Sequence, residues 1–304
     1  YLVAEADESD GSFLKYHPFI AVVTNIEDDH LDHYGTRENI ERAFLQFLSQ
    51  VAPQGMAVLC LDDPTIRRII PKVNCQRQVT YGIHSEADYT ARNIQLQGLS
   101  SKCDVYYHGQ LLGKLTLSVP GKHNAQNALA AIAVCHELGI EFSLIAKALQ
   151  CFTGVQRRFQ KIGEVRGIQI YDDYAHHPTE LKATITAAKN MKPKRVLAVF
   201  QPHRYSRTKF LCREFGTAFQ EADLLLINEI YPAGEKPIPG VNAGLIVEQV
   251  LEQTNQPTEY IPDRNVIVQR LLEISQPGDL IITLGAGNIW TVGQELYRRL
   301  TELA

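Results

Sequence analysis

Apolar residues along the first part of the chain form short continuous runs separated by a run with helical spacing. Two strand patterns, 21–26 and 55–61, flank the segment 36–51, whose apolar positions recur at helical intervals. A strand, a helix and a second strand in that order predict a parallel pair joined by a crossover helix. Shorter, more alternating runs between residues 78 and 119 predict antiparallel edge strands or hairpins.

The segment 120–140 has the clearest helical pattern of the chain. Pro120 and Gly121 end the strand before it, an asparagine is expected to cap the helix, and Gly139 ends it. A shorter helix is predicted over 143–150. With the strands before it, this helix pair indicates a mixed sheet with helices packed against it.

The pattern restarts at Gly154, which predicts two domains, 1–153 and 154–304. The second is a regular alternation typical of a doubly wound, Rossmann-like α/β sheet, in which ligands bind beyond the carboxyl ends of the strands. The expected strands are 168–173, 195–200, 223–230, 258–262 and 279–285. The expected helices are 178–191, 207–221, 243–254, 264–275 and 288–302.

Composition narrows the class of protein without naming a function. The 304 residues are 45% hydrophobic and 21% charged, with a net charge of −4. No basic excess points to nucleic acid and no polybasic run points to a membrane surface. The six cysteines contain no C-x-x-C pair, which favours free thiols in a reducing compartment. With no apolar run long enough to span a bilayer, we expect a cytoplasmic protein.

The chain opens on residues 1–4, which have a strand pattern with nothing before them. Natural domains rarely begin in the middle of a strand. We therefore expect this chain to be the downstream part of a longer protein.

Two acidic clusters, "AEADESD" and "NIEDDHLDHYG", follow apolar runs in the first domain. Like charges so close together repel unless something positive lies among them. If both runs end at one sheet edge, Glu5 and His30 converge, and a carboxylate with an imidazole suits Mg²⁺ or Mn²⁺ beside phosphates. A solvated loop that favours the positive end of the next helix is the alternative. The second cluster comprises Glu27, Asp28, Asp29, His30, Asp32 and His33.

Two loops after strands of the second domain carry candidate chemistry. In "DDYAHHPTE" (172–180), two acids, a tyrosine and two histidines exceed what a helix cap needs, so Asp173 and His176 are expected to orient a substrate or a ribose. In "QPHRYSRTKF" (201–210), the planar fork of each arginine suits a carboxylate or phosphate, and a helix start adds to an anion site. A surface basic cluster is the alternative reading of His203, Arg204 and Arg207.

Two further motifs leave alternatives open. "GVQRRFQ" (154–160) places two arginines at the domain junction, either to clamp a phosphate or within a hinge packed by Phe159. "LGAGNIW" (284–290) is only part of a dinucleotide fingerprint, and too little chain follows it for the required strand–helix–strand unit. A tight turn is the favoured reading, which argues against a nicotinamide-dependent oxidoreductase.

The motifs in combination resemble those of the Mur ligases. They are "EADESD", "TNIEDDHLDHYG", "GKHNAQNALAA", "GVQRRF", "YDDYAHHPTE", "QPHRYSRT", "YPAGEKPIPG" and "GAGNI", and they run almost from end to end. The resemblance implies part of a central ATPase domain followed by a Rossmann-like amino-acid-binding domain. It also implies that ATP, with Mg²⁺, phosphorylates the carboxylate of UDP-N-acetylmuramate. The amine of L-alanine then attacks the acyl phosphate, and catalysis is mainly positioning and charge neutralisation.

The resemblance also implies roles for residues of the first domain and of the junction. Glu5 and His30 resemble the magnesium ligands. Asn124 and Asn127 resemble the adenine contacts. Arg158 resembles the arginine that reaches the nucleotide from the C-terminal domain.

In the second domain, Asp173 resembles the acid on the ribose side of the nucleotide. Tyr174 and His176 resemble residues near the amino-acid site. The catalytic set that the resemblance implies is His30, Arg158, Asp173 and His176. The pocket for the carboxylate of alanine is implied at His203, Arg204 and Arg207, which agrees with the anion site inferred from the arginines alone.

One departure from the family pattern is serious. No G-x-x-G-K-[ST] phosphate loop occurs in this chain, because "PGKHN" lacks the loop length and the following Ser or Thr. The family's UDP-binding domain is also missing, and we expect both upstream of Tyr1. We therefore expect very weak ATP binding by this chain, and a monomer or weak dimer. The alternatives are the family member that attaches a murein tripeptide in cell-wall recycling and a non-catalytic nucleotide-binding module.

Overall fold

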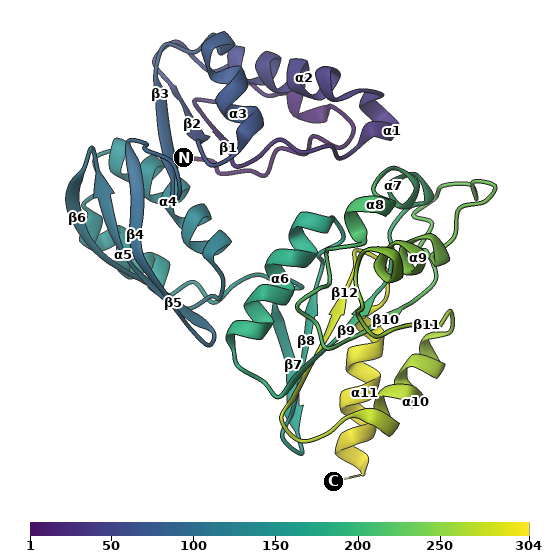
Figure 1. Ribbon diagram of the computed structural model, residues 1–304. Helices are drawn as coiled ribbons and strands as arrows, with labels where there is room; N and C mark the ends of the chain where they lie inside the picture. Colours follow the sequence, from purple (N-terminus) through teal and green to yellow (C-terminus); the bar gives the residue numbers. More distant parts are fainter. Residues whose placement is uncertain (304) are drawn as a thin grey trace. The chain divides into compact units, whose positions relative to one another are not determined.

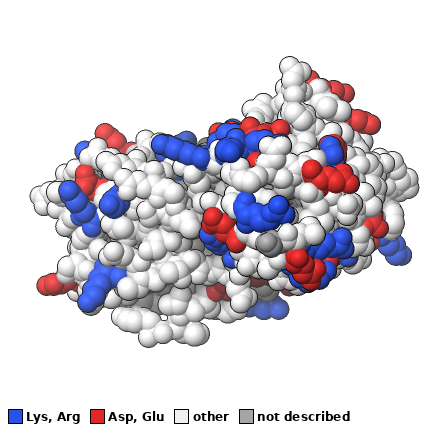
Figure 2. Space-filling model, turned by 90° about the horizontal axis from the view of Figure 1, so that it is seen from below, with Lys and Arg blue, Asp and Glu red and all other residues white. Residues whose placement is uncertain are grey.

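The computed structural model describes residues 1–303, apart from the side chain of Asp32, a member of the predicted acidic cluster. It divides into two compact units, one over Tyr1–Thr153 and one from Gly154 onward. Each unit is built on its own six-stranded sheet (Figure 1). On the face drawn in Figure 2, basic and acidic side chains are interspersed rather than separated by sign.

The first unit is a mixed sheet with the order β1-β2-β3-β4-β5-β6. The first four strands are parallel neighbours, and the last two pair antiparallel. This confirms the predicted parallel start and the hairpins after it. The strands are β1 (Ile20–Val23), β2 (Met56–Cys60), β3 (Gln78–Gly82), β4 (Tyr89–Gln97), β5 (Ser100–Tyr107) and β6 (Gln110–Leu117).

Helices and short 3₁₀ turns of the first unit enclose one apolar core against this sheet. In α2, Thr36 caps the first turn by accepting from the Asn39 backbone N–H, and Phe47 and Leu48 are buried. The elements are η1 (Ser12–Lys15), α1 (Leu31–Tyr34), α2 (Arg37–Ser49), α3 (Pro64–Ile69), η2 (Ile70–Lys72), α4 (Lys122–Glu137) and α5 (Phe142–Gln150). Sequence patterning did not predict α3, which is only six residues long.

Two local predictions for the first unit are wrong. Residues 1–4 form no strand with any described residue, and Tyr1, Leu2 and Val3 are 98%, 94% and 93% exposed. An apolar run becomes a strand only where a neighbouring strand pairs with it. At α4 the capping residue is Gly121, at φ 93°, and no side chain caps the helix. Asn124 lies inside the helix and donates to the Pro120 carbonyl instead.

The second unit is a doubly wound sheet with the order β11-β10-β9-β12-β8-β7, parallel except for β7. Apolar side chains of α6, α8 and α9 pack on one face, and those of α10 and α11 pack on the other. The strands are β7 (Gln160–Val165), β8 (Ile168–Asp173), β9 (Arg195–Phe200), β10 (Leu224–Ile227), β11 (Thr258–Tyr260) and β12 (Asp279–Leu284).

The predicted helix 207–221 is wrong in detail. Two short helices take its place, and the chain then continues in turns; Gly216 lies so close to α9 that a Cβ there would come within 2.9 Å of the Gln249 carbonyl oxygen. The rings of Phe215 and Phe219 both contact the Phe200 ring at a tilt, of 40° and 51°, and this packing takes the place of one continuous helix. The helices of this unit are α6 (Pro178–Asn190), α7 (Tyr205–Phe210), α8 (Cys212–Phe215), α9 (Gly244–Gln253), α10 (Arg264–Ile274) and α11 (Trp290–Glu302). Strand β7 was not predicted.

Candidate functional site

The carboxyl ends of the strands β8, β9, β10 and β12 lie level with one another in the second unit. Leu284 at the end of β12 pairs in register with both Asp173 of β8 and Phe200 of β9, and Phe200 pairs with Ile227 of β10. The loops that follow these strands therefore meet at one edge, where a doubly wound sheet binds its ligands. They carry the motifs that the sequence singled out.

Asp172, at the end of β8, is a buried carboxylate with a cationic partner. It accepts from Arg157 Nε at 3.0 Å and from Thr283 Oγ1 at 2.6 Å. Burial raises the pKa of Asp172, and the two donors oppose that rise. Arg157 also donates to the Gly285 carbonyl at 2.6 Å, and its guanidinium lies over the Tyr174 ring at 4.8 Å. Sequence reasoning gave Arg157 no role of its own.

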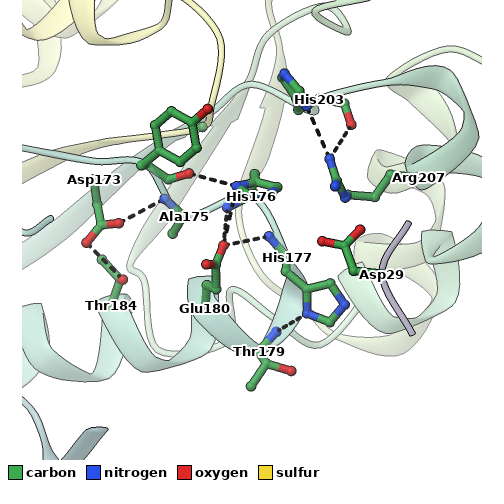
Figure 3. A network of polar contacts seen from close by, with 12 residues as sticks. Asp29, Asp173, Ala175, His176, His177, Thr179, Glu180, Thr184, His203 and Arg207 are labelled. Carbon is green, nitrogen blue, oxygen red and sulfur yellow. Dashed lines mark hydrogen bonds and ion pairs between the residues drawn. The ribbon is translucent and has the colours of Figure 1, made fainter. Parts of the chain in front are cut away.

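Asp173 is tied into its own unit through both carboxylate oxygens (Figure 3). Oδ1 accepts from the Ala175 N–H at 2.8 Å, and Oδ2 accepts from the Phe159 N–H at 2.9 Å and Thr184 Oγ1 at 3.2 Å. Burial raises its pKa to about 6. In this arrangement the carboxylate shapes the loop before α6. A contact with a ribose stays a prediction.

Glu180 organises the start of α6 and was missed by sequence reasoning. Its Oε2 accepts from the backbone N–H groups of His176 and His177 and lies 3.4 Å from His176 Nδ1. Burial opposes ionisation, but His176 and these N–H groups lower the pKa of Glu180 below its usual value. A capping box at the helix start (Figure 3) was the available signal, since Glu180 stands three residues after His177.

His203, in the loop after β9, is hydrogen-bonded to Arg207 of α7. Arg207 Nη1 donates to the His203 carbonyl at 3.2 Å and approaches His203 Nδ1 at 3.1 Å. A guanidinium has no acceptor, so Nδ1 accepts, and a neutral His203 then carries its proton on Nε2. Arg207 is buried, and the rings of His203 and His176 lie 5.8 Å apart. The structure thus brings His176 of one loop beside His203 of the next.

Three side-chain amides connect the segments that follow β9, β10 and β12. Gln201 donates to Asn228 Oδ1 and Asn288 Oδ1, both at 3.0 Å, and accepts from the Asn288 backbone N–H. The "GAGN" loop turns tightly here, in agreement with its prediction: Gly285 has φ 146°, and a Cβ on it would come within 2.8 Å of the Gln201 carbonyl oxygen. Gly285 and Gly287 thus allow this loop to pack closely against Gln201, at the start of the loop after β9.

The predicted nucleotide contacts of the first unit lie near the start of α4. Asn124 is partly buried and Asn127 is exposed, and their spacing places them on one face of the helix. Gln126 between them donates to Asp62 Oδ2 at 3.1 Å, and Asp62 also accepts from three backbone N–H groups after β3. Asp62 thereby anchors this end of α4. Sequence reasoning did not single it out.

Carboxylates from both acidic clusters lie close to His30 in the first unit. Its Nε2 lies 3.7 Å from a Glu8 carboxylate oxygen and 3.6 Å from an Asp29 carboxylate oxygen, while Glu5 is exposed. Among the residues with described side chains, no three His, Cys, Asp or Glu residues are grouped as a metal site. The pairing of Glu5 with His30 as magnesium ligands stays a prediction.

No described helix is long and apolar enough to cross a membrane.

The two sheets and the polar edge of the second define a two-unit α/β protein with a Rossmann-like C-terminal unit. Comparison with protein families narrows this class. Residues 1–135 match the model of the Mur ligase middle domain, and residues 157–287 match that of the Mur ligase, glutamate ligase domain. The chain belongs to the Mur ligase family.

Named relatives agree with this assignment. A UDP-N-acetylmuramate–L-alanine ligase of Pelotomaculum thermopropionicum is 53% identical over 303 residues, which are 99% of this chain and 66% of the relative. A crystal structure of a UDP-N-acetylmuramate–alanine ligase from Thermotoga maritima is similar with a TM-score of 0.79 and 25% identity, over 98% of this chain and 63% of that one. A murein peptide ligase from Psychrobacter arcticus shares the fold, with a TM-score of 0.67 and 23% identity, over 96% and 60%. The chain spans about two thirds of the length of the curated relatives it matches.

Proposed function

We propose that this chain contributes the larger part of an ATP-dependent ligase that joins L-alanine to UDP-N-acetylmuramate. The observation that carries the proposal is the 53% identity, across 99% of this chain, to a relative that bears that name. The location of the reaction in the cytoplasm and a monomeric or weakly dimeric state belong to the same proposal.

The proposed amino-acid pocket is the carboxyl edge of the second sheet. There Arg204 and Arg207 offer the cations that a substrate carboxylate requires, and neutral His203 offers an Nε2–H donor. Arg207 is buried, where a charge-assisted hydrogen bond is strongest. Tyr174 and His176 form the adjoining wall, with their rings 5.5 Å apart. Such a site holds the small amino acid by its carboxylate, which leaves the amine to react.

The proposed nucleotide contacts are Asn124 and Asn127 for the adenine, Asp173 on the ribose side and Arg158 for the phosphates. Arg158 is 51% exposed and pairs with Glu180 at 3.3 Å, so its guanidinium is accessible to a ligand. Glu5 and His30 are the proposed contacts of Mg²⁺. ATP with its metal supplies activation of the sugar carboxylate as an acyl phosphate, since direct amide formation from an acid and an amine is uphill. The protein's own part is to position the reactants and neutralise charge.

The test is phosphate release from ATP by the complete natural protein, given UDP-N-acetylmuramate and either L-alanine or the murein tripeptide. We expect release with L-alanine and its loss in Arg204→Ala. Lys209→Ala is the matched control, because Lys209 is an exposed cation on α7 itself. Release only with the tripeptide would move the proposal to cell-wall recycling. Release with neither, from a folded protein, would favour a non-catalytic nucleotide-binding module.

A further inference from the structure

The turn after β10 clamps the loop that carries the proposed carboxylate pocket. Tyr231 donates its backbone N–H to the Pro202 carbonyl and accepts from the Arg204 N–H, both at 2.8 Å. The Tyr231 ring lies parallel to the His203 ring, with centroids 5.6 Å apart and an interplanar angle of 10°. The loop over 201–204 is therefore held along its backbone and through one of its side chains.

The turn itself has an unusual backbone. The Glu235 N–H donates to the Pro232 carbonyl at 3.0 Å, and the two central residues, Ala233 and Gly234, have φ of 50° and 86°. Two left-handed residues in succession are typical of a type I′ turn, which favours glycine, asparagine or aspartate. Ala233 is unfavourable there, so the surrounding structure holds the turn in place. What the turn presents to the pocket loop is the side chain of Glu235.

Both oxygens of the Glu235 carboxylate accept from Ser206, in the first turn of α7 after that loop. Oε2 accepts from the Ser206 backbone N–H at 3.1 Å, and Oε1 accepts from the Ser206 hydroxyl. Oε1 also lies 3.9 Å from Arg204 Nη1. The side chain of Glu235 is 20% exposed and that of Arg204 is 30% exposed, so solvent screens this ion pair only in part. A single carboxylate thus orients one cation of the pocket and the backbone two residues after it.

We propose that Glu235 is a positioning residue of the amino-acid pocket, which holds Arg204 ready for the carboxylate of the substrate. The inference rests on the proposed function and deepens it. A long arginine side chain that is already ordered loses less freedom when the ligand binds, and this raises affinity. A carboxylate that only neutralised Arg204 would have the opposite effect, because its removal would free the guanidinium for the substrate.

The two roles predict opposite shifts in steady-state kinetics of the complete natural protein. We expect Glu235→Gln to raise KM for L-alanine about tenfold, with kcat changed by less than about twofold. Ser206→Ala keeps the backbone donor and should raise KM by a smaller factor. The control is Glu229→Gln, at an acid between β10 and the same turn that accepts from the Tyr260 hydroxyl and the Ile230 N–H. The KM of this variant should equal that of the wild type. An unchanged or lowered KM in Glu235→Gln would overturn the proposal.

A second measurement tests Glu235 without relying on ligase activity. Phenylglyoxal modifies accessible guanidinium groups, and mass spectrometry of peptides reports the rate at each arginine. In Glu235→Gln we expect faster modification of Arg204 and an unchanged rate at Arg213, which is exposed on α8. Equal rates at Arg204 in variant and wild type would overturn the positioning role. If Arg204 of the wild type is modified more slowly than Arg204 of the variant, but the wild type releases no phosphate with L-alanine, the proposed function would be wrong while the positioning role stands.

Discussion

Arg157 and Asp172 form an ion pair that links the start of the second unit to the carboxyl end of β8. Arg157 Nε donates to Asp172 Oδ2 at 3.0 Å across 15 residues of chain. The Arg157 carbonyl in turn accepts from the Tyr174 N–H at 2.6 Å. The pair therefore joins the segment 157–159 to the loop before α6, and the proposed site depends on both.

Arg157→Ala is expected to destabilise the second unit. The Asp172 side chain is only 4% exposed, so the substitution leaves a buried charge without its cation. Loss of one partner of a buried pair costs about 3 kcal/mol of unfolding free energy. The neighbouring Arg158→Ala is the matched control, because that side chain is 51% exposed and its pair contributes at most about 1 kcal/mol. Urea denaturation measures both. If both variants lose the same unfolding free energy, the Arg157–Asp172 pair contributes no more to stability than an exposed ion pair.

Asp173 predicts a pH dependence of stability. Burial raises its pKa to about 6 from 3.8, so between these values the folded state holds a proton that the unfolded state has lost. The free energy of unfolding should therefore fall as pH rises from about 4 to about 6, by about 3 kcal/mol from this group. Asp173→Asn removes the titration. Its unfolding free energy should vary less over that range, and parallel curves for variant and wild type would contradict the assignment.

Arg207→Lys is expected to weaken the use of L-alanine in the complete natural protein. Lysine keeps the charge but not the planar fork that donates to His203 and presents further N–H groups. The loss of one charge-assisted hydrogen bond corresponds to about a tenfold or larger rise in KM. Phosphate release at varied L-alanine concentration measures it, with Lys209→Arg as the exposed control. A KM within about twofold of the wild type would place the carboxylate elsewhere.

Gly287→Ala is expected to disturb the packing between the segments that follow β9, β10 and β12. A Cβ there would come within 2.4 Å of Gln201 Oε1 and 2.7 Å of Tyr231 Cγ. Both contacts are too short, so both neighbours must shift, at a cost of about 1–3 kcal/mol. A displaced Tyr231 would also loosen His203. Thermal unfolding compared with Ala286→Ser, a substitution at the partly exposed residue next to it, separates this clash from a general effect of the loop. Equal stability of the two variants would refute the clash.

The 304-residue chain is expected to bind ATP with a Kd of about 1 mM or weaker. A phosphate loop normally cradles the phosphates with backbone N–H groups and a lysine, and this chain contains no such motif. Adenosine is the matched control, since contacts from Asn124 and Asn127 alone would bind it as well as ATP. Titration calorimetry in the presence of Mg²⁺ compares the two ligands. Micromolar ATP affinity would contradict the expectation.

Local patterning predicted most of the fold because the strands of the second unit are continuous apolar runs. The predicted strands 168–173 and 195–200 coincide with β8 and β9. Prediction failed where a distant partner decides the local structure. Residues 1–4 have a strand pattern but pair with no described strand, and 207–221 is broken because aromatic packing on Phe200 outweighs helical continuity.

The sequence by itself determined the alternation of strands and helices, the motifs that follow the strands, and the arginines and histidines of the proposed anion site. These depend on side-chain spacing and residue type, which are read directly along a chain. Only the tertiary structure decided which polar groups meet, for example Glu8 beside His30, and Glu235 against Ser206 and Arg204. Such pairings depend on how loops from separate strands turn and pack, and no periodicity of the chain encodes that geometry.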